Sequence, residues 1–112
     1  MAKTKRHGGR RLSIRIRGVY FDQIVRGDKT VELRKTSPYW LSRANRLLAS
    51  KARLWVAVFV CGPHVHRREI IAIKFGKASE FLKRELSEQG KRDLGGDDPE
   101  VVAFFLGDEI GA

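Results

Sequence analysis

The sequence is poor in cysteine and has no long hydrophobic segment. Cys61 is the single cysteine among 112 residues, so an internal disulfide is excluded. A chain without disulfides suits a reducing compartment, and we therefore expect a cytoplasmic location. The continuous apolar run at 54–61 is much shorter than the roughly 20 residues of a membrane-spanning helix. The N-terminus is basic and lacks the apolar core of a secretory signal, so no membrane partner is expected.

Acidic residues are scarce in the first two thirds of the chain. Residues 1–74 contain 18 Lys and Arg against 4 Asp and Glu, a net charge of +14. Residues 75–112 contain 5 against 9, a net charge of −4, which gives +10 for the whole chain. A positive field attracts polyanions, and nucleic acid is the commonest of these. The charge predicts nucleic acid as the partner; the alternative is a basic protein with no such partner.

The hydrophobic pattern predicts one α+β domain. Residues 1–10 contain almost no apolar side chains and are expected to form a flexible basic arm, followed by a single domain over 11–112. Alternating or continuous apolar runs predict strands, and apolar residues at helical spacing predict helices. The expected strands are 11–17, 30–34, 54–61, 69–75 and 101–106, and the expected helices are 20–26, 38–50 and 80–90. The predicted order is therefore β-α-β-α-β-β-α-β.

Several of these boundaries depend on local capping and turn residues. Ser37 before Pro38 is typical of a helix start. The apolar run 54–61 predicts a central strand covered on both faces. After it, residues 64–68 are expected to form a basic turn, and Ser79 is expected to cap the third helix, which Gly90 would end.

The segment Gly27–Lys35 is the strongest candidate for a functional site. After a helix that ends at Gly27, alternation gives the next strand an apolar face and a polar face, namely Val31 and Leu33 against Thr30, Glu32 and Arg34. One acid and several donors within so few residues suit a polar or anionic ligand, whereas the alternative is an edge strand with a solvated charged face. Lys29 and Glu32 are three residues apart. In a regular strand they point to opposite faces, so they converge only at a bulge or a strand end.

Basic and aromatic side chains elsewhere predict a surface for nucleic acid. The strand 11–17 presents a row of arginines, whose guanidinium groups bind phosphate in a two-pronged geometry. The helix 38–50 carries arginines on its outer face and begins with two aromatic residues; we expect Trp40 in the core and Tyr39 at a ligand cleft. The expected nucleic-acid-binding residues are Arg11, Arg15, Arg17, Lys29, Thr30, Glu32, Arg34, Lys35, Tyr39, Arg43 and Arg46.

Metal and nucleophile patterns are weak. Cys61, His64 and His66 have a spacing that suits zinc, but no fourth ligand with motif spacing follows, so a polar turn is preferred and no metal or cofactor is expected. No histidine lies at a recognisable distance from Thr30 or Ser37, and no glycine-rich phosphate loop has the required strand-to-helix context.

The segment from Leu12 to Arg34 resembles the start of ASCH domains. Their hallmark Gly-x-Lys-x-x-Glu-x-Arg is matched by Gly27, Lys29, Glu32 and Arg34, and the resemblance extends over 11–107. It implies a PUA-like β-barrel of about five to six strands with two to three helices packed outside. It also implies a cleft beside the motif that binds RNA or modified nucleosides.

Some members of this family are enzymes. One bacterial group hydrolyses N4-acetylcytidine with a lysine and a threonine of this segment and a later glutamate; another member is described as a ribonuclease. Lys29 matches that lysine, but Glu32 stands where the threonine would be, and Thr30 is beside Lys29 instead. Glu85 or Glu88 could supply the later glutamate, with no motif to choose between them.

The sequence therefore favours an RNA-binding ASCH domain, with a nucleotide or modified base in a cleft beside the motif. The alternative is a small hydrolase acting on RNA or a nucleoside, with Lys29 as electrostatic stabiliser and Glu32 as general base. Within that alternative, phosphodiester cleavage is preferred to amide hydrolysis of N4-acetylcytidine. A third possibility is a protein-interaction module with an acidic partner. The sequence does not fix the oligomeric state.

Overall fold

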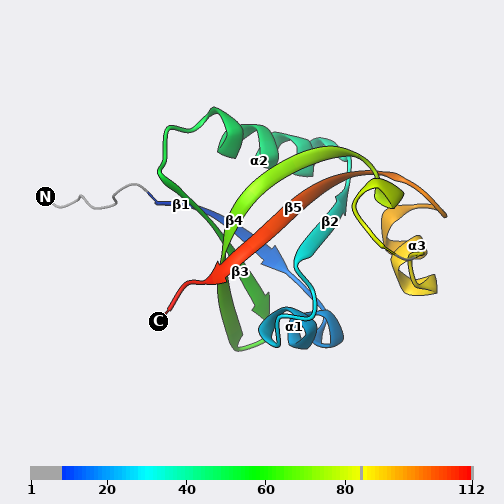
Figure 1. Ribbon diagram of the computed structural model, residues 1–112, viewed down its shortest axis with the longest axis horizontal. Helices are drawn as coiled ribbons and strands as arrows, with labels where there is room; N and C mark the ends of the chain where they lie inside the picture. The colour runs from blue at the N-terminus through cyan, green and yellow to red at the C-terminus, as the bar shows by residue number, and fades with distance from the viewer. Residues whose placement is uncertain (1–8, 84, 112) are drawn as a thin grey trace, which may run out of the picture.

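Five strands form one sheet that curls into half of a barrel, with three helices around it (Figure 1). The computed structural model describes residues 9–83 and 85–111. The elements are β1 (Gly9–Arg15), α1 (Gly18–Val25), β2 (Val31–Lys35), α2 (Pro38–Ala49), β3 (Leu54–Cys61), β4 (His64–Lys77), a 3₁₀ turn η2 (Ala78–Glu80), α3 (Glu88–Leu94) and β5 (Glu100–Glu109). The predicted α+β class and order of elements are confirmed. Residues 1–8 of the predicted arm lie outside the described residues, whereas Gly9 and Arg10 already belong to β1.

The strand order leaves two strands at the edges of the sheet. The order is β1-β3-β4-β5-β2, with β1 parallel to β3 and all other neighbours antiparallel. The sheet curls so that a side chain of β2 reaches the backbone of β1: Nη2 of Arg34 donates to the Arg15 carbonyl oxygen at 3.1 Å. The two edges therefore face one another across an open seam, which a side chain rather than a backbone ladder bridges.

The larger core fills the concave side of the sheet. Figure 1 shows α2 and α1 near opposite ends of this side. They contribute Leu47 and Ile24, which pack with Ile14, Phe59 and Phe104, all at most 2% exposed. Burying each of these side chains stabilises the fold by about 1.5–3 kcal/mol. The helices are thus held to the sheet by their apolar faces.

A second, smaller core covers the opposite face of β5. Val101 and Ala103 of β5 pack there with Leu33 of β2 and Ala78. Val102 and Phe104 point the other way, into the larger core. The strand buried on both faces is therefore β5. β3 (54–61) lies between β1 and β4, but its second face is covered only in part, because Val56 is buried whereas Val58 and Val60 are half-buried.

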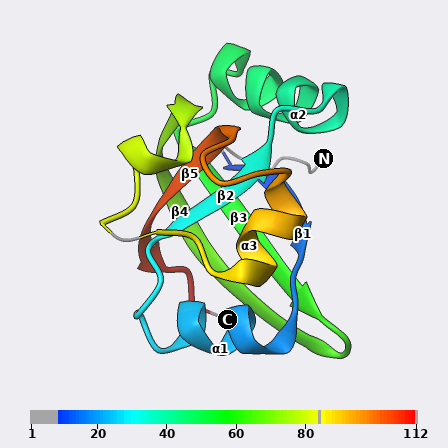
Figure 2. The same cartoon turned by 90° about the vertical axis from the view of Figure 1, so that its right-hand side faces the viewer.

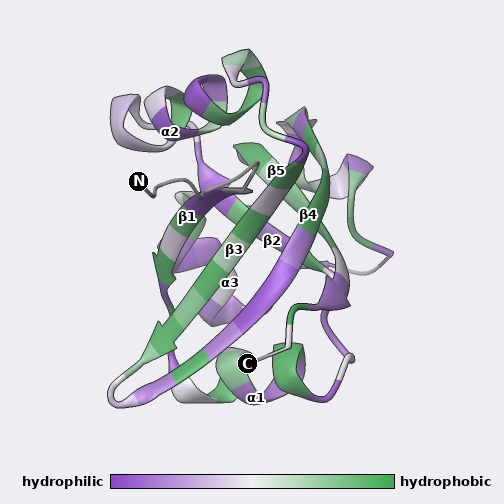
Figure 3. Cartoon of the chain, turned by 90° about the vertical axis from the view of Figure 1, so that its left-hand side faces the viewer, coloured by the Kyte–Doolittle hydropathy of each residue, from purple (hydrophilic) through white to green (hydrophobic). Residues whose placement is uncertain are grey.

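The hairpin between β3 and β4 is tighter than predicted. The turn contains only Gly62 and Pro63, because Gly62 has a φ of 59°, which suits the first position of a two-residue turn. Residues 64–68, predicted as a basic turn, therefore belong to β4. Hydrophilic residues fill much of the first half of β4, whereas β3 is hydrophobic along its length (Figure 3).

A bulged region breaks the alternation predicted for the second half of β4. The register between β4 and β5 shifts between Arg68 and Ile70 and again between Ile70 and Ala72. Ile70 and Ile73 therefore both contact the larger core, although they are three positions apart, whereas Ile71 is 61% exposed. Strict alternation along 69–75 would place Ile71, Ile73 and Phe75 on one face, and the bulges prevent this.

The second helix starts as predicted, but the third does not. The Ser37 hydroxyl accepts the Trp40 N–H at 3.3 Å, which caps α2. Ser79 instead binds Asp98 through its N–H and hydroxyl, both at 2.8 Å, and only a 3₁₀ turn forms there. The helix begins later: Ser87 caps α3 and Gly95, at a φ of 94°, ends it. No helix in the described ranges is long and apolar enough to cross a membrane.

His66 is a buried titratable group on the core side of β4. It lies opposite Phe59, is 7% exposed, and its Nε2 has no hydrogen-bond partner. Burial lowers the pKa of His66 from the usual 6.5; the carboxylate of Glu109 opposes this shift, and the guanidinium of Arg68 adds to it. The folded protein therefore favours the neutral imidazole.

We expect acid to destabilise the protein through His66. The unfolded chain binds a proton below pH 6.5, whereas the folded chain resists it until its lower pKa is reached, so the free energy of unfolding falls as pH decreases through this window. Urea unfolding between pH 5 and 7.5 measures this slope. His66→Gln should flatten it, and exposed His64→Gln should not. An equal slope in the wild type and His66→Gln would contradict the assignment.

Candidate functional site

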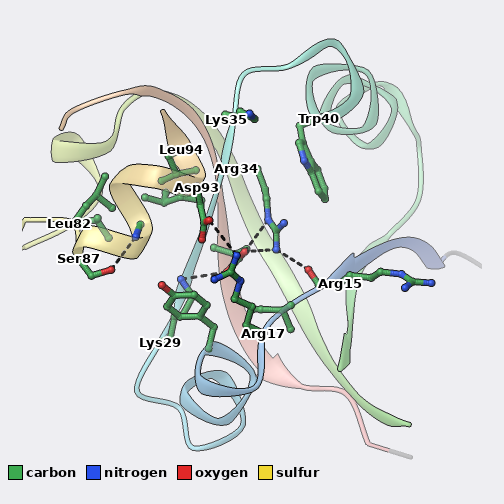
Figure 4. A pocket seen from close by; sticks show the side chains of 16 residues that line it. Arg15, Arg17, Lys29, Arg34, Lys35, Trp40, Leu82, Ser87, Asp93 and Leu94 are labelled. Atoms are coloured by element: carbon green, nitrogen blue, oxygen red, sulfur yellow. Dashed lines mark hydrogen bonds and ion pairs between the residues drawn. The ribbon is translucent and has the colours of Figure 1, made fainter. Parts of the chain in front are cut away.

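A cavity of about 290 Å³ lies between the free edges of β1 and β2. Figure 2 shows α3 across the space between these strands, and Figure 4 shows the side chains that enclose it. The lining residues are Arg15, Ile16, Arg17, Tyr20, Lys29, Glu32, Leu33, Arg34, Lys35, Trp40, Leu82, Leu86, Ser87, Gly90, Asp93 and Leu94. The curl of the sheet therefore brings the ends of β1 and β2 together with the third helix.

A buried carboxylate holds two cations at the centre of the cavity. Oε1 of Glu32 lies 3.2 Å from Nζ of Lys29. Oε2 accepts from Arg34, at 2.9 Å from Nε and 2.8 Å from Nη2. Lys29 also donates to the Val31 carbonyl oxygen at 3.0 Å. Lys29 and Arg34 thus each contact more than one acceptor, which fixes the orientation of their side chains.

Lys29 and Glu32 meet because Lys29 precedes the strand. The N–H groups of Asp28 and Lys29 both donate to the Gln23 carbonyl oxygen, at 2.9 and 3.1 Å, after Gly27 turns the chain at a φ of 82°. β2 begins only at Val31, so strand alternation does not apply to Lys29. Lys29 and Glu32 therefore converge because Lys29 lies just before the strand begins.

Glu32 is too buried to be part of a solvated edge. The residue is 4% exposed, and Oε1 has less than 1 Å² of accessible area and no partner with hydrogen-bond geometry. The charged face of β2 thus points into the half-barrel, opposite Phe104 of β5, which rules out the solvated-face alternative. Burying a carboxylate is costly unless cations compensate it, so Glu32 positions Lys29 and Arg34.

Aromatic rings extend the charged centre along α2. The Arg34 guanidinium carbon lies 4.9 Å from the Trp40 ring centroid, and that of Arg43 lies 4.1 Å from the Tyr39 ring centroid. Trp40 packs on the larger core, as expected, and also lines the cavity. Tyr39 is 54% exposed and does not line the cavity, so the expected placement of Tyr39 in the cleft was wrong.

The expected binding residues divide into two groups. Arg15, Arg17, Lys29, Glu32, Arg34 and Lys35 line the cavity. Arg11, Thr30, Tyr39, Arg43 and Arg46 lie outside it. Arg11 is exposed on β1, and the Thr30 carbonyl oxygen accepts the Leu106 N–H at 2.8 Å, which extends the pairing of β2 with β5.

Sequence reasoning missed the side of the cavity that α3 provides. Leu82 and Leu86, which precede α3, and Leu94 at its end form an apolar wall, and Asp93 of α3 is 3.5 Å from Arg17. The Ser87 cap and the left-handed Gly95 were the available indications of this helix. No pattern in the sequence indicated the contact between Asp93 and Arg17, because the two residues are 76 positions apart in the chain.

The Cys61, His64 and His66 cluster belongs to the β3–β4 hairpin and not to the cavity. Cys61 and His64 pair across the turn, and His66 faces the core. In residues 9–83 and 85–111, no group of three His, Cys, Asp or Glu side chains is arranged to hold a metal.

The cavity combines positive charge with apolar walls. Five cationic side chains line it, against the carboxylates of Glu32 and Asp93. Such a site attracts an anion that also has a flat or apolar part. No protein-family model, curated protein or solved structure matches the chain. The cavity itself therefore provides the basis for a functional interpretation.

Glu32→Gln should destabilise the fold. A neutral amide leaves two partly buried cations without their counter-charge, and we expect a loss of about 2 kcal/mol in the free energy of unfolding. Urea denaturation at pH 7 measures it. Glu85→Gln removes an acid that is 91% exposed and should change stability by less than about 0.5 kcal/mol. Equal stability of the two variants would contradict the positioning role of Glu32.

Proposed function

We propose that the protein binds RNA or a free nucleotide, with one nucleotide in the cavity between β1 and β2. The observation that carries this proposal is the excess of oriented cations over carboxylates in a cavity with apolar walls. The cavity volume of about 290 Å³ is near the lower limit of small-molecule sites, about 300–1,000 Å³. It therefore suits a single nucleotide better than a duplex.

The cationic centre provides the contacts for an anion. A guanidinium has five N–H groups and an ammonium has three, so Arg34 and Lys29 have more donors than their contacts with Glu32 require. Both side chains are 23% exposed. A phosphate or a base carbonyl can accept from them, whereas Tyr20 and Leu86 offer surfaces for the base.

The edge strand β1 extends the positive surface from Arg15, which lines the cavity, to Arg11 outside it. Arg11 and Arg15 are exposed there on the same face, since their neighbours Leu12 and Ile14 point to the core. These arginines are suited to the backbone of the remaining strand of RNA. The half-barrel and the Gly27–Arg34 motif support assignment to the PUA-like ASCH domains, which is part of the same proposal.

Lys29→Ala should weaken binding to short single-stranded RNA by about tenfold, because a lost charged contact costs about 1.4 kcal/mol. Fluorescence titration at two salt concentrations measures this. Arg11→Ala should weaken binding to all RNA sequences alike. It should also reduce the slope of log affinity against log salt concentration by about one. Arg53→Ala, an exposed arginine outside both groups, is the control. An affinity that does not depend on salt would contradict the proposal.

A hydrolase acting on RNA is the second candidate, because Lys29 and Glu32 are in contact. As a general base, Glu32 must reach a substrate or water proton. Its occluded Oε1 favours binding over this chemistry. Amide hydrolysis of N4-acetylcytidine has less support: Thr30, Glu85 and Glu88 do not line the cavity.

We expect no turnover. Purified protein incubated with single-stranded RNA, hairpin RNA and N4-acetylcytidine should leave each intact by gel electrophoresis and mass spectrometry. Product that appears with the wild type and disappears with Lys29→Ala would instead establish the hydrolase. Product that persists in the variant would indicate a contaminating enzyme.

A further inference from the structure

A carboxylate of α3 contacts an arginine at the rim of the cavity. Oδ1 of Asp93 lies 3.5 Å from Nη2 of Arg17, and the side chains are 38% and 60% exposed (Figure 4). Gln89, one turn earlier in α3, donates its amide N–H to the same Oδ1 at 2.8 Å. Asp93 is thereby directed towards Arg17 by its own helix.

Asp93 lies where an anionic ligand is most favoured. Arg17 lines the same cavity as Lys29 and Arg34, whose charges are only partly balanced by Glu32. To a guanidinium, a carboxylate and a phosphate present the same kind of anionic oxygen. Asp93 thus makes with Arg17 the contact that a ligand phosphate can make.

The contact is easily broken. Exposed ion pairs contribute little to stability, and a separation of 3.5 Å is long for a charge-assisted hydrogen bond. None of the α3 residues is buried, and Gly95 and Gly96, both at positive φ, follow the helix directly. Leu94 of α3 packs on the smaller core, but the Asp93 side chain is 38% exposed, so rotating it away from Arg17 disturbs neither core.

We propose that Arg17 is the phosphate subsite of the cavity and that Asp93 occupies it until a ligand phosphate displaces the carboxylate. The inference rests on the proposed function and narrows its ligand to a phosphorylated nucleotide rather than a nucleoside. Asp93 acts as an internal competitor that lowers affinity for phosphate and leaves the contacts of the base unchanged.

The first experiment compares 5′-UMP with uridine by isothermal titration calorimetry at low salt. Asp93→Asn keeps an acceptor for Gln89 and removes the charge, so it should bind 5′-UMP about threefold more tightly, the scale of an exposed ion pair. Its affinity for uridine should not change. Asp108→Asn removes an exposed acid at the far end of β5 and controls for net charge.

Arg17→Gln completes the cycle. It should weaken 5′-UMP binding, and adding Asp93→Asn to it should give no further gain, because the arginine for which the two anions compete is absent. Three results would overturn the proposal that Arg17 is the phosphate subsite. They are a gain in 5′-UMP affinity from Asp93→Asn that persists without Arg17, an equal gain in affinity for uridine, and no gain over Asp108→Asn.

Inorganic phosphate separates failure of the subsite from failure of the proposed function. NMR titration of the arginine Nε–Hε signals should shift Arg17 in Asp93→Asn at lower phosphate concentration than in the wild type. If this shift occurs but neither 5′-UMP nor RNA binds, the subsite stands and the proposed function fails. If RNA binds with dependence on Lys29 but phosphate does not shift Arg17, the subsite alone fails.

Discussion

The ionic contacts of the buried Glu32 carboxylate connect the fold to the cavity. Glu32 accepts from Arg34, and the same guanidinium donates to the Arg15 carbonyl oxygen on the opposite edge strand. A half-barrel has no continuous backbone ladder at its seam, so this side-chain bridge relates β2 to β1. The charge that holds Arg34 thereby also supports the contact between the two edge strands beside the cavity.

Burial of one acid between two cations has an electrostatic consequence. A lone carboxylate in the half-barrel would lose its hydration, and Lys29 and Arg34 together compensate for that loss. Two cations overcompensate one acid, so a positive charge is retained where the side chains are held most firmly. A ligand anion then meets donors that are already oriented and loses less entropy on binding than it would with free surface lysines.

Local signals predicted the elements whose formation depends on local residues. Ser37 and Pro38 specify the start of α2, and the apolar run 54–61 coincides with β3. The bulges near Ile70 and the two-sided burial of β5 arise from packing between distant segments, so alternation could not reveal them. The meeting of Lys29 and Glu32 depends on where β2 begins, and a period-two pattern does not mark that boundary. Asp93 and Arg17 meet only through the tertiary fold, so the local sequence around neither residue predicts their contact.

The position of the cavity at the seam gives the arginines of β1 two roles. A free strand edge is liable to pair with another copy of the chain, and positive side chains oppose this because like charges repel. Arg11 and Arg15 are exposed at such an edge, beside the cavity that Arg34 and Lys29 make positive. In the proposed function, the same positive charge attracts a polyanion to this edge. Under the proposed function, loss of an arginine from β1 should therefore reduce solubility as well as affinity, whereas loss of Lys29 should reduce affinity and remove part of the compensation of the Glu32 charge.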